Sequence, residues 1–206
     1  MVRCIVFDFD GTLVDSNAVK QRAYFDIFPP PYRPHVESVL RDRKYANRFE
    51  KIDLIVRRMT GTPPAQEEIA RYAAAYNDIC EAHQATCDER RGAGKVLARL
   101  ATRIPLYLWS GTFEVPLRRI VSQRGWSGFF RGIFGSPDSK ADNLARIALH
   151  AALPCEALLV VGDTCDDLDA ATACGCQFAG IVSDATDFDR NRIRVIPDLI
   201  QLEAMC

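Results

Sequence analysis

Short apolar runs that alternate with helical patterns constrain the fold of this chain more than any other feature. The run from Val2 to Phe7 is continuous and rich in β-branched residues, which is typical of a buried strand. Similar runs follow at 104–109, 132–134, 157–161, 178–182 and 193–196. Helical patterns lie between them, at 94–102, 114–123, 140–151 and 167–174. This alternation predicts an α/β fold, a Rossmann-like core whose parallel sheet is covered by helices on both faces.

The connection between the first two predicted strands is the exception to this pattern. The segment from Phe7 to Ile104 is far longer than the roughly 30 residues of a whole βαβ unit. Inside it, apolar residues follow helical spacing at 45–59 and again at 69–83. We therefore predict an inserted α-helical domain. The predicted limits are 16–88 for this insert and 1–15 with 89–206 for the α/β core.

The charge balance excludes several classes of partner. The 206 residues carry 26 Lys and Arg against 27 Asp and Glu, for a net charge of -1. Such an even balance, without a long run of one sign, is unlike proteins that bind nucleic acid or anionic membranes. The apolar runs are also far shorter than the roughly 20 residues that cross a bilayer. We expect no nucleic-acid partner and no membrane partner.

The eight cysteines do not form a recognisable metal or disulfide pattern. No Cys-x-x-Cys occurs, and Cys174 and Cys176 have no histidine or second cysteine pair nearby to complete a zinc site. The N-terminal apolar run is cut by Asp8 and Asp10, so it does not resemble a secretory signal. We expect free thiols and a cytoplasmic protein.

Polar residues of particular kinds follow the first four predicted strands. They are Asp8 and Asp10, then Ser110, then Lys140, then Asp163 and Asp167. In an open parallel sheet, ligands bind beyond the carboxyl ends of the strands, so these side chains are expected to converge. Carboxylates that converge need a cation, and oxygen ligands suit Mg²⁺. A hydroxyl, an ammonium group and the N–H groups of glycine loops suit a phosphoryl group.

Four sequence motifs resemble, in kind and in order, those of the haloacid dehalogenase superfamily. They are the stretch 8–16, which begins Asp8-Phe9-Asp10-Gly11-Thr12, then Ser110, Lys140, and Gly162-Asp163-Thr164 with Asp167. The resemblance covers the whole chain, and the helical insert corresponds to the cap domain of that superfamily. The nearest resemblance is to phosphoglycolate phosphatase-like and β-phosphoglucomutase-like members.

This resemblance implies roles for the acidic residues. Asp8 would be the nucleophile that forms an aspartyl-phosphate, and Asp10 would be the general acid and then the general base. Mg²⁺ would bind to Asp8, to the main-chain carbonyl of Asp10 and to Asp163, with Asp167 reaching it directly or through water. An acid at position 10 favours phosphate-ester chemistry, because a leaving alkoxide needs a proton.

The same resemblance implies a set of phosphate-binding residues. Ser110 and Lys140 would hold the phosphoryl oxygens, helped by backbone N–H groups near Gly11, Thr12 and Gly111.

Other polar residues have a plainer interpretation. Asp15 and Ser16 are expected to cap the first helix of the insert, and Asp166 and Asp169 to lie on the exposed first turn of a later helix. Most basic residues of the insert are expected to form a solvated face, with one or two of them binding a carboxylate or second phosphate of the substrate. These basic residues are Arg41, Arg43, Lys44, Arg48, Lys51, Arg57 and Arg58.

Three functions remain open at this point. The first is an Mg²⁺-dependent phosphatase that hydrolyses a small phosphorylated metabolite, similar to phosphoglycolate or a sugar phosphate, through an aspartyl-phosphate. The second is a phosphomutase of the β-phosphoglucomutase type. The third is a phospho-aspartate switch, which the large insert disfavours because a lid that selects substrates serves an enzyme. We expect a monomer or homodimer.

Overall fold

The computed structural model describes residues 1–42 and 48–205. The chain divides into two compact units, one of Met1–Asn17 with Gln84–Cys206 and one of Ala18–His83. The second unit is shorter at both ends than the insert of 16–88 expected from the sequence. Ser16 and Gln84, which the sequence assigned to the insert, fall in the first unit, and both donate hydrogen bonds to Asp10.

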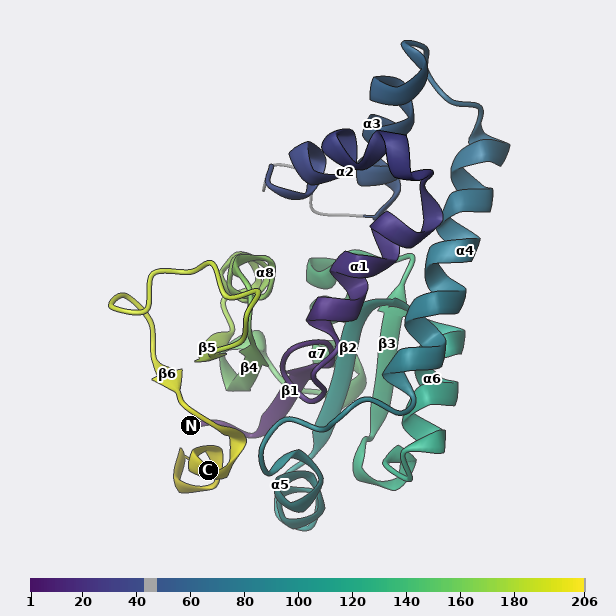
Figure 1. Ribbon diagram of the computed structural model, residues 1–206. Coiled ribbons are helices and arrows are strands. Elements are labelled where there is room, and N and C mark those ends of the chain that lie inside the picture. Colours follow the sequence, from purple (N-terminus) through teal and green to yellow (C-terminus); the bar gives the residue numbers. More distant parts are fainter. Residues whose placement is uncertain (43–47, 206) are drawn as a thin grey trace. The chain divides into compact units, whose positions relative to one another are not determined.

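The first unit contains a six-stranded parallel sheet with strand order β3-β2-β1-β4-β5-β6 (Figure 1). The strands are β1 (Cys4–Asp8), β2 (Leu106–Phe113), β3 (Gly132–Ser136), β4 (Leu158–Gly162), β5 (Gln177–Ile181) and β6 (Val195–Ile196). This is the Rossmann strand order, in which the direction of winding reverses between β1 and β4. The predicted α/β fold with a parallel Rossmann-like sheet is confirmed.

Helices cover both faces of this sheet. They are α5 (Ala93–Leu100), α6 (Glu114–Gln123), α7 (Lys140–Ala151) and α8 (Cys165–Cys174). Successive residues of β1 point to opposite faces, as the pleat of a strand requires. Ile5 and Phe7 share a buried cluster with residues of α5 and α6, whereas Cys4 and Val6 share another with residues of α7 and α8. Two apolar cores therefore fix the sheet from both sides.

The second unit is helical. It is built from most of α1 (Asn17–Ile27), η1 (Pro30–Tyr32), α2 (Arg33–Leu40), α3 (Arg48–Thr60) and most of α4 (Gln66–Gln84). Its own core includes Tyr24 and Tyr76, whose ring centroids lie 4.6 Å apart. The helical spacing found at 69–83 lies within α4. The spacing at 45–59 corresponds to α3, apart from residues 45–47, which lie outside the described residues.

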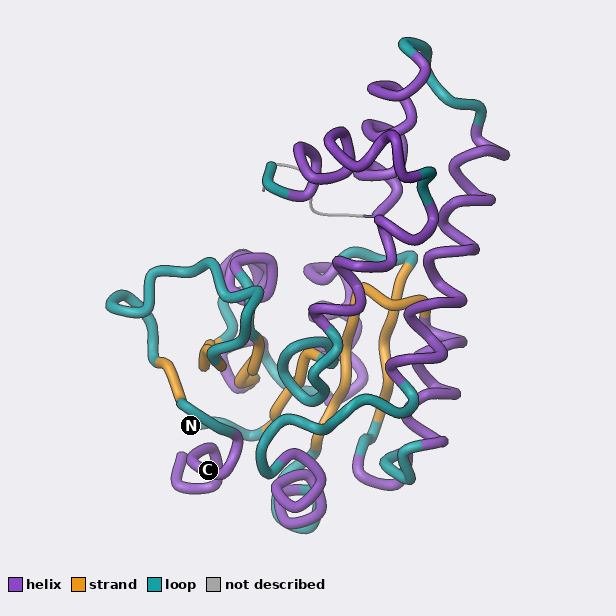
Figure 2. The backbone as a smooth tube through the Cα atoms, viewed as in Figure 1, coloured by secondary structure: helices purple, strands orange, loops and turns teal. Residues whose placement is uncertain are grey.

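Long loops and short 3-10 helices complete the first unit. The 3-10 helices are η2 (Ser127–Phe129), η3 (Cys155–Ala157) and η4 (Leu199–Met205). A loop of residues 182–194 joins β5 to β6 (Figure 2). The seven cysteines among the described residues are free thiols. A search of the same residues finds no helix with both the length and the apolar character of a membrane span.

Candidate active site

The turn after β1 brings polar residues together at the carboxyl end of the sheet. Leu13 N–H donates to the Phe9 carbonyl at 2.9 Å, and Gly11 N–H donates to the Val14 carbonyl at 2.8 Å. Gly11 has a φ of 78°, and a Cβ atom at this position would lie 2.1 Å from Asp163 Oδ2. The turn therefore needs a glycine both for its backbone conformation and for the close approach of a carboxylate.

The buried Asp8, Asp163 and Asp167 and the half-buried Lys140 form a group that we call the charged cluster. One carboxylate oxygen of each aspartate lies within 4.8 Å of the others. Lys140 Nζ is 2.6 Å from Asp167 Oδ1 and 3.4 Å from Asp8 Oδ1. These residues come from three separate segments of the chain, at the end of β1, at the start of α7 and after β4.

The charged cluster has the donor set of a hard divalent cation. Three carboxylates against one ammonium group leave an excess of negative charge in a buried place. Oxygen ligands of one Mg²⁺ ion lie about 3 to 4 Å apart, given metal–oxygen distances of 2.0–2.1 Å. The spacing of the three carboxylates is close to this range. The residues present therefore fit a metal such as Mg²⁺.

The electrostatics of the cluster reflect this crowding. Burial, with the charges of Asp167, Asp163 and Asp10, raises the pKa of Asp8 well above its ordinary value, while Lys140 lowers it. Burial and the charge of Asp167 raise the pKa of Asp163 to about 6. Burial would lower the pKa of Lys140, but Asp167, Asp8 and Asp166 raise it well above its ordinary value. Lys140 is therefore a permanent cation of the cluster.

Asp163 is held in place by three neutral donors. Thr12 Oγ1 donates to Asp163 Oδ1 at 3.2 Å, and Asn17 Nδ2 donates to Oδ2 at 3.0 Å. Ser183 Oγ donates to the same Oδ2 at 2.5 Å. Both oxygens of this carboxylate are thus fixed in direction, which is what a metal-binding carboxylate requires.

Asp167 also stabilises the start of a helix. Its Oδ2 accepts from Thr164 N at 3.1 Å and from Thr164 Oγ1 at 2.8 Å, in a capping box at the start of α8. Its other oxygen, Oδ1, accepts from Lys140, the first residue of α7. The ammonium group of Lys140 lies 5.4 Å from the centroid of the buried Trp109 ring. The first turns of α7 and α8 therefore position Lys140 and Asp167 in the charged cluster.

Asp10 has different surroundings, which we call the Asp10 cluster. Ser16 Oγ and Gln84 Nε2 each donate to Asp10 Oδ1 at 2.5 Å. Ser110 Oγ donates to Oδ2 at 3.1 Å, and Thr112 Oγ1 donates to the same oxygen at 3.3 Å. All five residues are buried. These four partners are uncharged, so Asp10 is held by hydrogen bonds and not by an ion pair with them.

The residues expected to bind phosphate do not all lie in one group. Ser110 lies in the Asp10 cluster, where its one hydroxyl hydrogen goes to Asp10 and its oxygen accepts from Thr112 N at 3.0 Å. Lys140 lies in the charged cluster. Thr12 donates its hydroxyl hydrogen to Asp163 of that cluster. Gly111 is exposed, and its carbonyl accepts from Ser136 Oγ at 3.0 Å.

Several residues of the site were not predicted from the sequence, and one was predicted to have another role. Gln84 lies 74 positions from Asp10, inside the segment assigned to the insert, and no local signal marks it. Thr112 and Ser183 do follow predicted strands, so the rule that selected Ser110 could have found them. Ser16, expected to cap a helix, donates its hydroxyl to Asp10.

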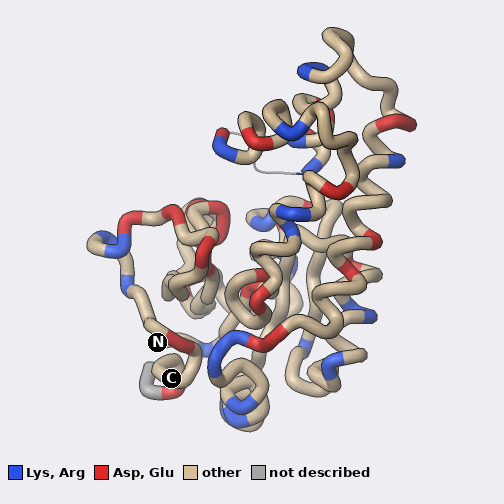
Figure 3. Tube along the Cα trace, in the orientation of Figure 1, with Lys and Arg blue, Asp and Glu red and all other residues tan. Residues whose placement is uncertain are grey.

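The plainer interpretations of other charged residues can also be compared with the structure. Asp166 and Asp169 are exposed on α8, as expected, and Asp166 Oδ2 lies 3.4 Å from Lys140 Nζ. Acidic residues gather on α8 and on the loop after β5 (Figure 3). In the helical unit, Arg41 pairs with Glu37 and Arg57 with Asp53. Arg43 and Lys44 lie outside the described residues.

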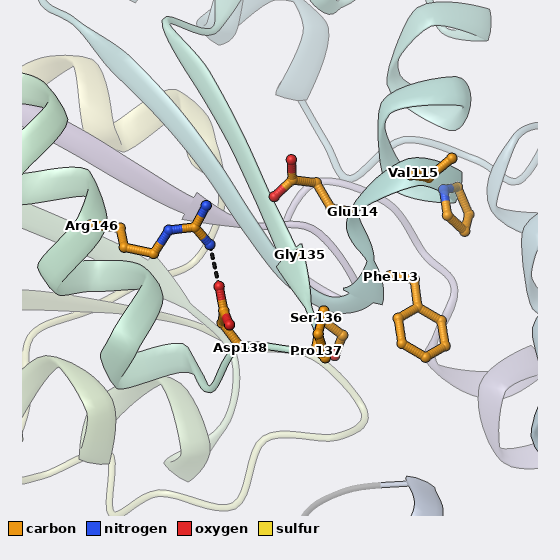
Figure 4. Close-up of a pocket in the computed structure, with 9 residues that line it drawn as sticks. Phe113, Glu114, Val115, Gly135, Ser136, Pro137, Asp138 and Arg146 are labelled. Carbon is orange, nitrogen blue, oxygen red and sulfur yellow. Dashed lines mark hydrogen bonds and ion pairs between the residues drawn. The ribbon is translucent and has the colours of Figure 1, made fainter.

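A separate open cavity of about 550 Å³ lies where β2 and β3 end (Figure 4). Arg146 and Asp138, which form an ion pair, line one side of it. Its other lining residues are Phe113, Glu114, Val115, Pro116, Gly135, Ser136 and Pro137. The lining contains no member of the charged cluster or of the Asp10 cluster.

Comparison with known proteins gives a family. A model of the haloacid dehalogenase-like hydrolases matches residues 2–175 of the chain. No curated protein matches the chain.

Solved structures share the fold over nearly the full length. A predicted phosphoglycolate phosphatase from Haemophilus somnus has a TM-score of 0.78 and 15% identity, covering 99% of this chain and 97% of that one. CbbY from Rhodobacter sphaeroides, solved with phosphate, has a TM-score of 0.74 and 19% identity, covering 98% and 96%. A mutant of CbbY has been solved with xylulose-(1,5)bisphosphate. A related hydrolase from Bacillus subtilis, bound to magnesium, has a TM-score of 0.71 and 17% identity, covering 99% and 98%.

Proposed function

The chain belongs to the haloacid dehalogenase-like hydrolases, and we propose that it is an Mg²⁺-dependent phosphatase of a small phosphorylated metabolite. The observation that carries the proposal is the contrast between two aspartates only two residues apart. Asp8 lies 3.4 Å from Lys140 in a buried acidic cluster, whereas Asp10 accepts hydrogen bonds from the hydroxyl groups of Ser110 and Thr112. One aspartate is thus suited to attack phosphorus and the other to transfer a proton.

In the first step, a carboxylate oxygen of Asp8 attacks the phosphorus atom. The bond between phosphorus and the leaving oxygen breaks, and Asp10 gives its proton to that oxygen, so that the alcohol leaves neutral. The product on the enzyme is an aspartyl-phosphate. Lys140 supplies positive charge beside the phosphoryl oxygens as negative charge builds on them.

In the second step, a water molecule attacks the phosphorus of the aspartyl-phosphate. Asp10 takes a proton from this water, and the bond between phosphorus and Asp8 breaks. Inorganic phosphate leaves, and both aspartates return to their starting protonation states. Ser110 can turn its single hydroxyl hydrogen either to Asp10 or to a phosphoryl oxygen, so it can serve both groups in turn.

The charged cluster provides the ligands for Mg²⁺ in this proposal. Asp8, Asp163 and Asp167 would hold the ion through their carboxylates, together with the main-chain carbonyl of Asp10. When bound, Mg²⁺ supplies positive charge that offsets the carboxylates and the phosphoryl oxygens. Thr12, Asn17 and Ser183 orient Asp163 for this purpose.

The substrate class is a phosphate monoester of a small metabolite, with phosphoglycolate and sugar phosphates as the first compounds to test. CbbY, which shares the fold, has been solved with xylulose-(1,5)bisphosphate. We further propose that the protein works as a monomer or homodimer in the cytoplasm, without a nucleic-acid or membrane partner. The free thiols of the described cysteines support a reducing compartment.

The test is phosphate release from a panel of phosphoglycolate, sugar phosphates and p-nitrophenyl phosphate, with Mg²⁺ or with a chelator. We expect release with Mg²⁺ only, and a loss of at least about 10⁴-fold in Asp8→Asn, because that variant lacks the nucleophile. Asp169→Asn is the matched control, since Asp169 is an exposed acid outside the cluster. An Asp8→Asn protein that kept its activity would refute the proposal.

The same assay separates the two other functions. Isomerisation of a sugar phosphate without net phosphate release would identify a phosphomutase. A long-lived phospho-aspartate on Asp8, formed from a small phosphodonor without turnover, would identify a switch.

A further inference from the structure

We infer that Gln84 and Thr112 are positioning residues for Asp10, and that the three side chains form a closed ring of hydrogen bonds. This inference rests on the proposed function, because it assigns the two residues to the proton-transfer group of that reaction. Neither residue belongs to the four motifs that indicated the function.

The ring has three hydrogen bonds. Gln84 Nε2 donates to Asp10 Oδ1 at 2.5 Å and to Thr112 Oγ1 at 3.1 Å. Thr112 Oγ1 in turn donates to Asp10 Oδ2 at 3.3 Å. The two hydrogens of the amide and the one hydrogen of the hydroxyl are all used, so the pattern obeys the donor capacity of each group.

The order of donors fixes the direction of each hydrogen. Because the amide of Gln84 fills a lone pair of Thr112 Oγ1, the hydroxyl hydrogen of Thr112 has to point elsewhere, and Asp10 Oδ2 is its acceptor. Each oxygen of Asp10 is therefore held by a different member of the ring. A carboxylate bound at both oxygens resists rotation of its plane.

Gln84 is itself held firmly. It is the last residue of α4 and only 1% exposed. Its main-chain carbonyl accepts from Arg124 Nε at 2.8 Å, and Arg124 Nη2 donates to the Cys87 carbonyl at 2.6 Å. Thr112 lies on β2, so the ring is supported by a strand and by a fixed main chain.

The amide oxygen of Gln84 shows which half of the side chain matters. Among the described residues, this buried Oε1 atom has no hydrogen-bond partner. Buried polar atoms are usually paired, and an unpaired one costs free energy. An apolar side chain would avoid that cost, so the contribution of Gln84 comes from its NH₂ group, both hydrogens of which enter the ring.

Positioning of Asp10 matters most when the leaving group needs a proton. The ratio kcat/KM reports on steps up to the release of the leaving group. An alkyl phosphate such as glycerol phosphate needs a proton from Asp10 in that step, whereas p-nitrophenyl phosphate does not. A ring that positions Asp10 should therefore affect kcat/KM for the alkyl ester and spare it for the aryl ester.

The experiment compares four variants on these two esters. Thr112→Val removes the hydroxyl at constant shape, Thr112→Ser restores it, Gln84→Leu removes the amide, and the fourth variant combines Thr112→Val with Gln84→Leu. We expect Thr112→Val and Gln84→Leu to lose about tenfold in kcat/KM for the alkyl ester and less than about twofold for p-nitrophenyl phosphate. Thr112→Ser should retain the wild-type ratio between the esters. The double variant should lose little more than either single variant, because one break already opens the ring.

Other outcomes would overturn the inference. Equal losses on both esters, with a lowered melting temperature, would show that the ring only supports the fold. Additive losses in the double variant would show that the two residues act separately. An inactive wild-type protein would instead refute the proposed phosphatase, and wild-type activity with Asp8→Asn inactive separates that failure from a failure of the ring.

Discussion

Asp8 and Asp10 are neighbours in sequence but lie in opposite chemical surroundings. Asp8 is in contact with a lysine and two further aspartates, where charge dominates. Asp10 accepts hydrogen bonds from four uncharged side chains, those of Ser16, Gln84, Ser110 and Thr112. Only Phe9 lies between the two aspartates, and the charge of Asp10 still raises the pKa of Asp8.

This difference shows how two identical side chains can take different roles. A nucleophile must be ionised to attack, and Lys140 opposes the rise in the pKa of Asp8 that burial and the neighbouring carboxylates cause. A proton-transfer group must exchange a proton within one turnover. Hydroxyl groups such as those of Ser16 and Ser110 can donate to an ionised carboxylate and accept from a protonated one, so they can orient Asp10 in both states. Four experiments can break or sharpen this contrast.

The largest effect is expected from Asp10→Asn. This variant keeps the size of the side chain but cannot give a proton, so kcat/KM for an alkyl phosphate should fall by about 10³-fold. With p-nitrophenyl phosphate, formation of the aspartyl-phosphate should be nearly unchanged, as measured in a single turnover. Equal slowing with both esters would mean that Asp10 does not act as the acid.

Lys140→Met tests the charged cluster with the next largest effect. Loss of the ammonium group removes positive charge beside Asp8, and kcat/KM should fall by about 10²-fold. The loss should be the same for alkyl and aryl esters, because charge stabilisation does not depend on the leaving group. A loss confined to alkyl esters would show that Lys140 acts on proton transfer by Asp10 and not on the charge of the phosphoryl oxygens.

Asp163→Asn tests the cost of collecting carboxylates. The pKa of Asp163 is raised from 3.8 to about 6, so the folded metal-free protein binds this proton more tightly than the unfolded chain does. The contribution of Asp163 to the free energy of unfolding is fully present below about pH 4 and is lost as the pH rises through about 6. Removing the charge should therefore stabilise the metal-free protein near neutral pH, by up to about 3 kcal/mol.

Urea unfolding in the presence of a chelator measures this effect. The advantage of Asp163→Asn over the wild type should shrink as the pH is lowered toward about 4, and added Mg²⁺ should stabilise the wild type more than the variant. A variant that is less stable than the wild type near neutral pH, without metal, would contradict the expectation.

Ser16→Ala should have the smallest effect. It removes one of several donors to Asp10, and a single hydrogen bond to a charged group contributes about 1.5 to 3 kcal/mol, a share of which the remaining donors can replace. We expect a loss of about threefold to tenfold in kcat/KM for alkyl phosphates. Ser16→Thr keeps the hydroxyl and should stay near the wild type. A Ser16→Ala protein with unchanged kinetics would remove Ser16 from the Asp10 cluster in functional terms.

The α/β core was predictable because its signals are local. Each strand of the sheet is a short apolar run, and the polar residue that follows it lies at the carboxyl edge by geometry alone. Asp8, Lys140, Asp163 and Asp167 could therefore be named before the structure, and they do meet. Gly11 was named as well, although its tight approach to Asp163 could not be foreseen.

The surroundings of Asp10 were not predictable in the same way. Gln84 donates to Asp10 from the end of a helix that the sequence assigned to the insert. A glutamine at a helix end is not specific to any one role, so the sequence did not indicate this contact. A serine just before a helix is typical of a helix cap. The sequence therefore predicted this local role for Ser16 and not its hydrogen bond to Asp10. Hydrogen bonds between neutral groups and a distant carboxylate leave no periodic pattern in a sequence.

The position of Lys140 above Trp109 has a spectroscopic consequence. A buried indole responds to nearby charge, and an ammonium group 5.4 Å from its centroid is part of the field that sets its emission. Any ion or phosphate that draws Lys140 away should shift the fluorescence of this ring, and Trp109→Phe should abolish the shift while Trp126→Phe preserves it. The protein thus carries an intrinsic optical probe of its own charged cluster, readable without substrate turnover.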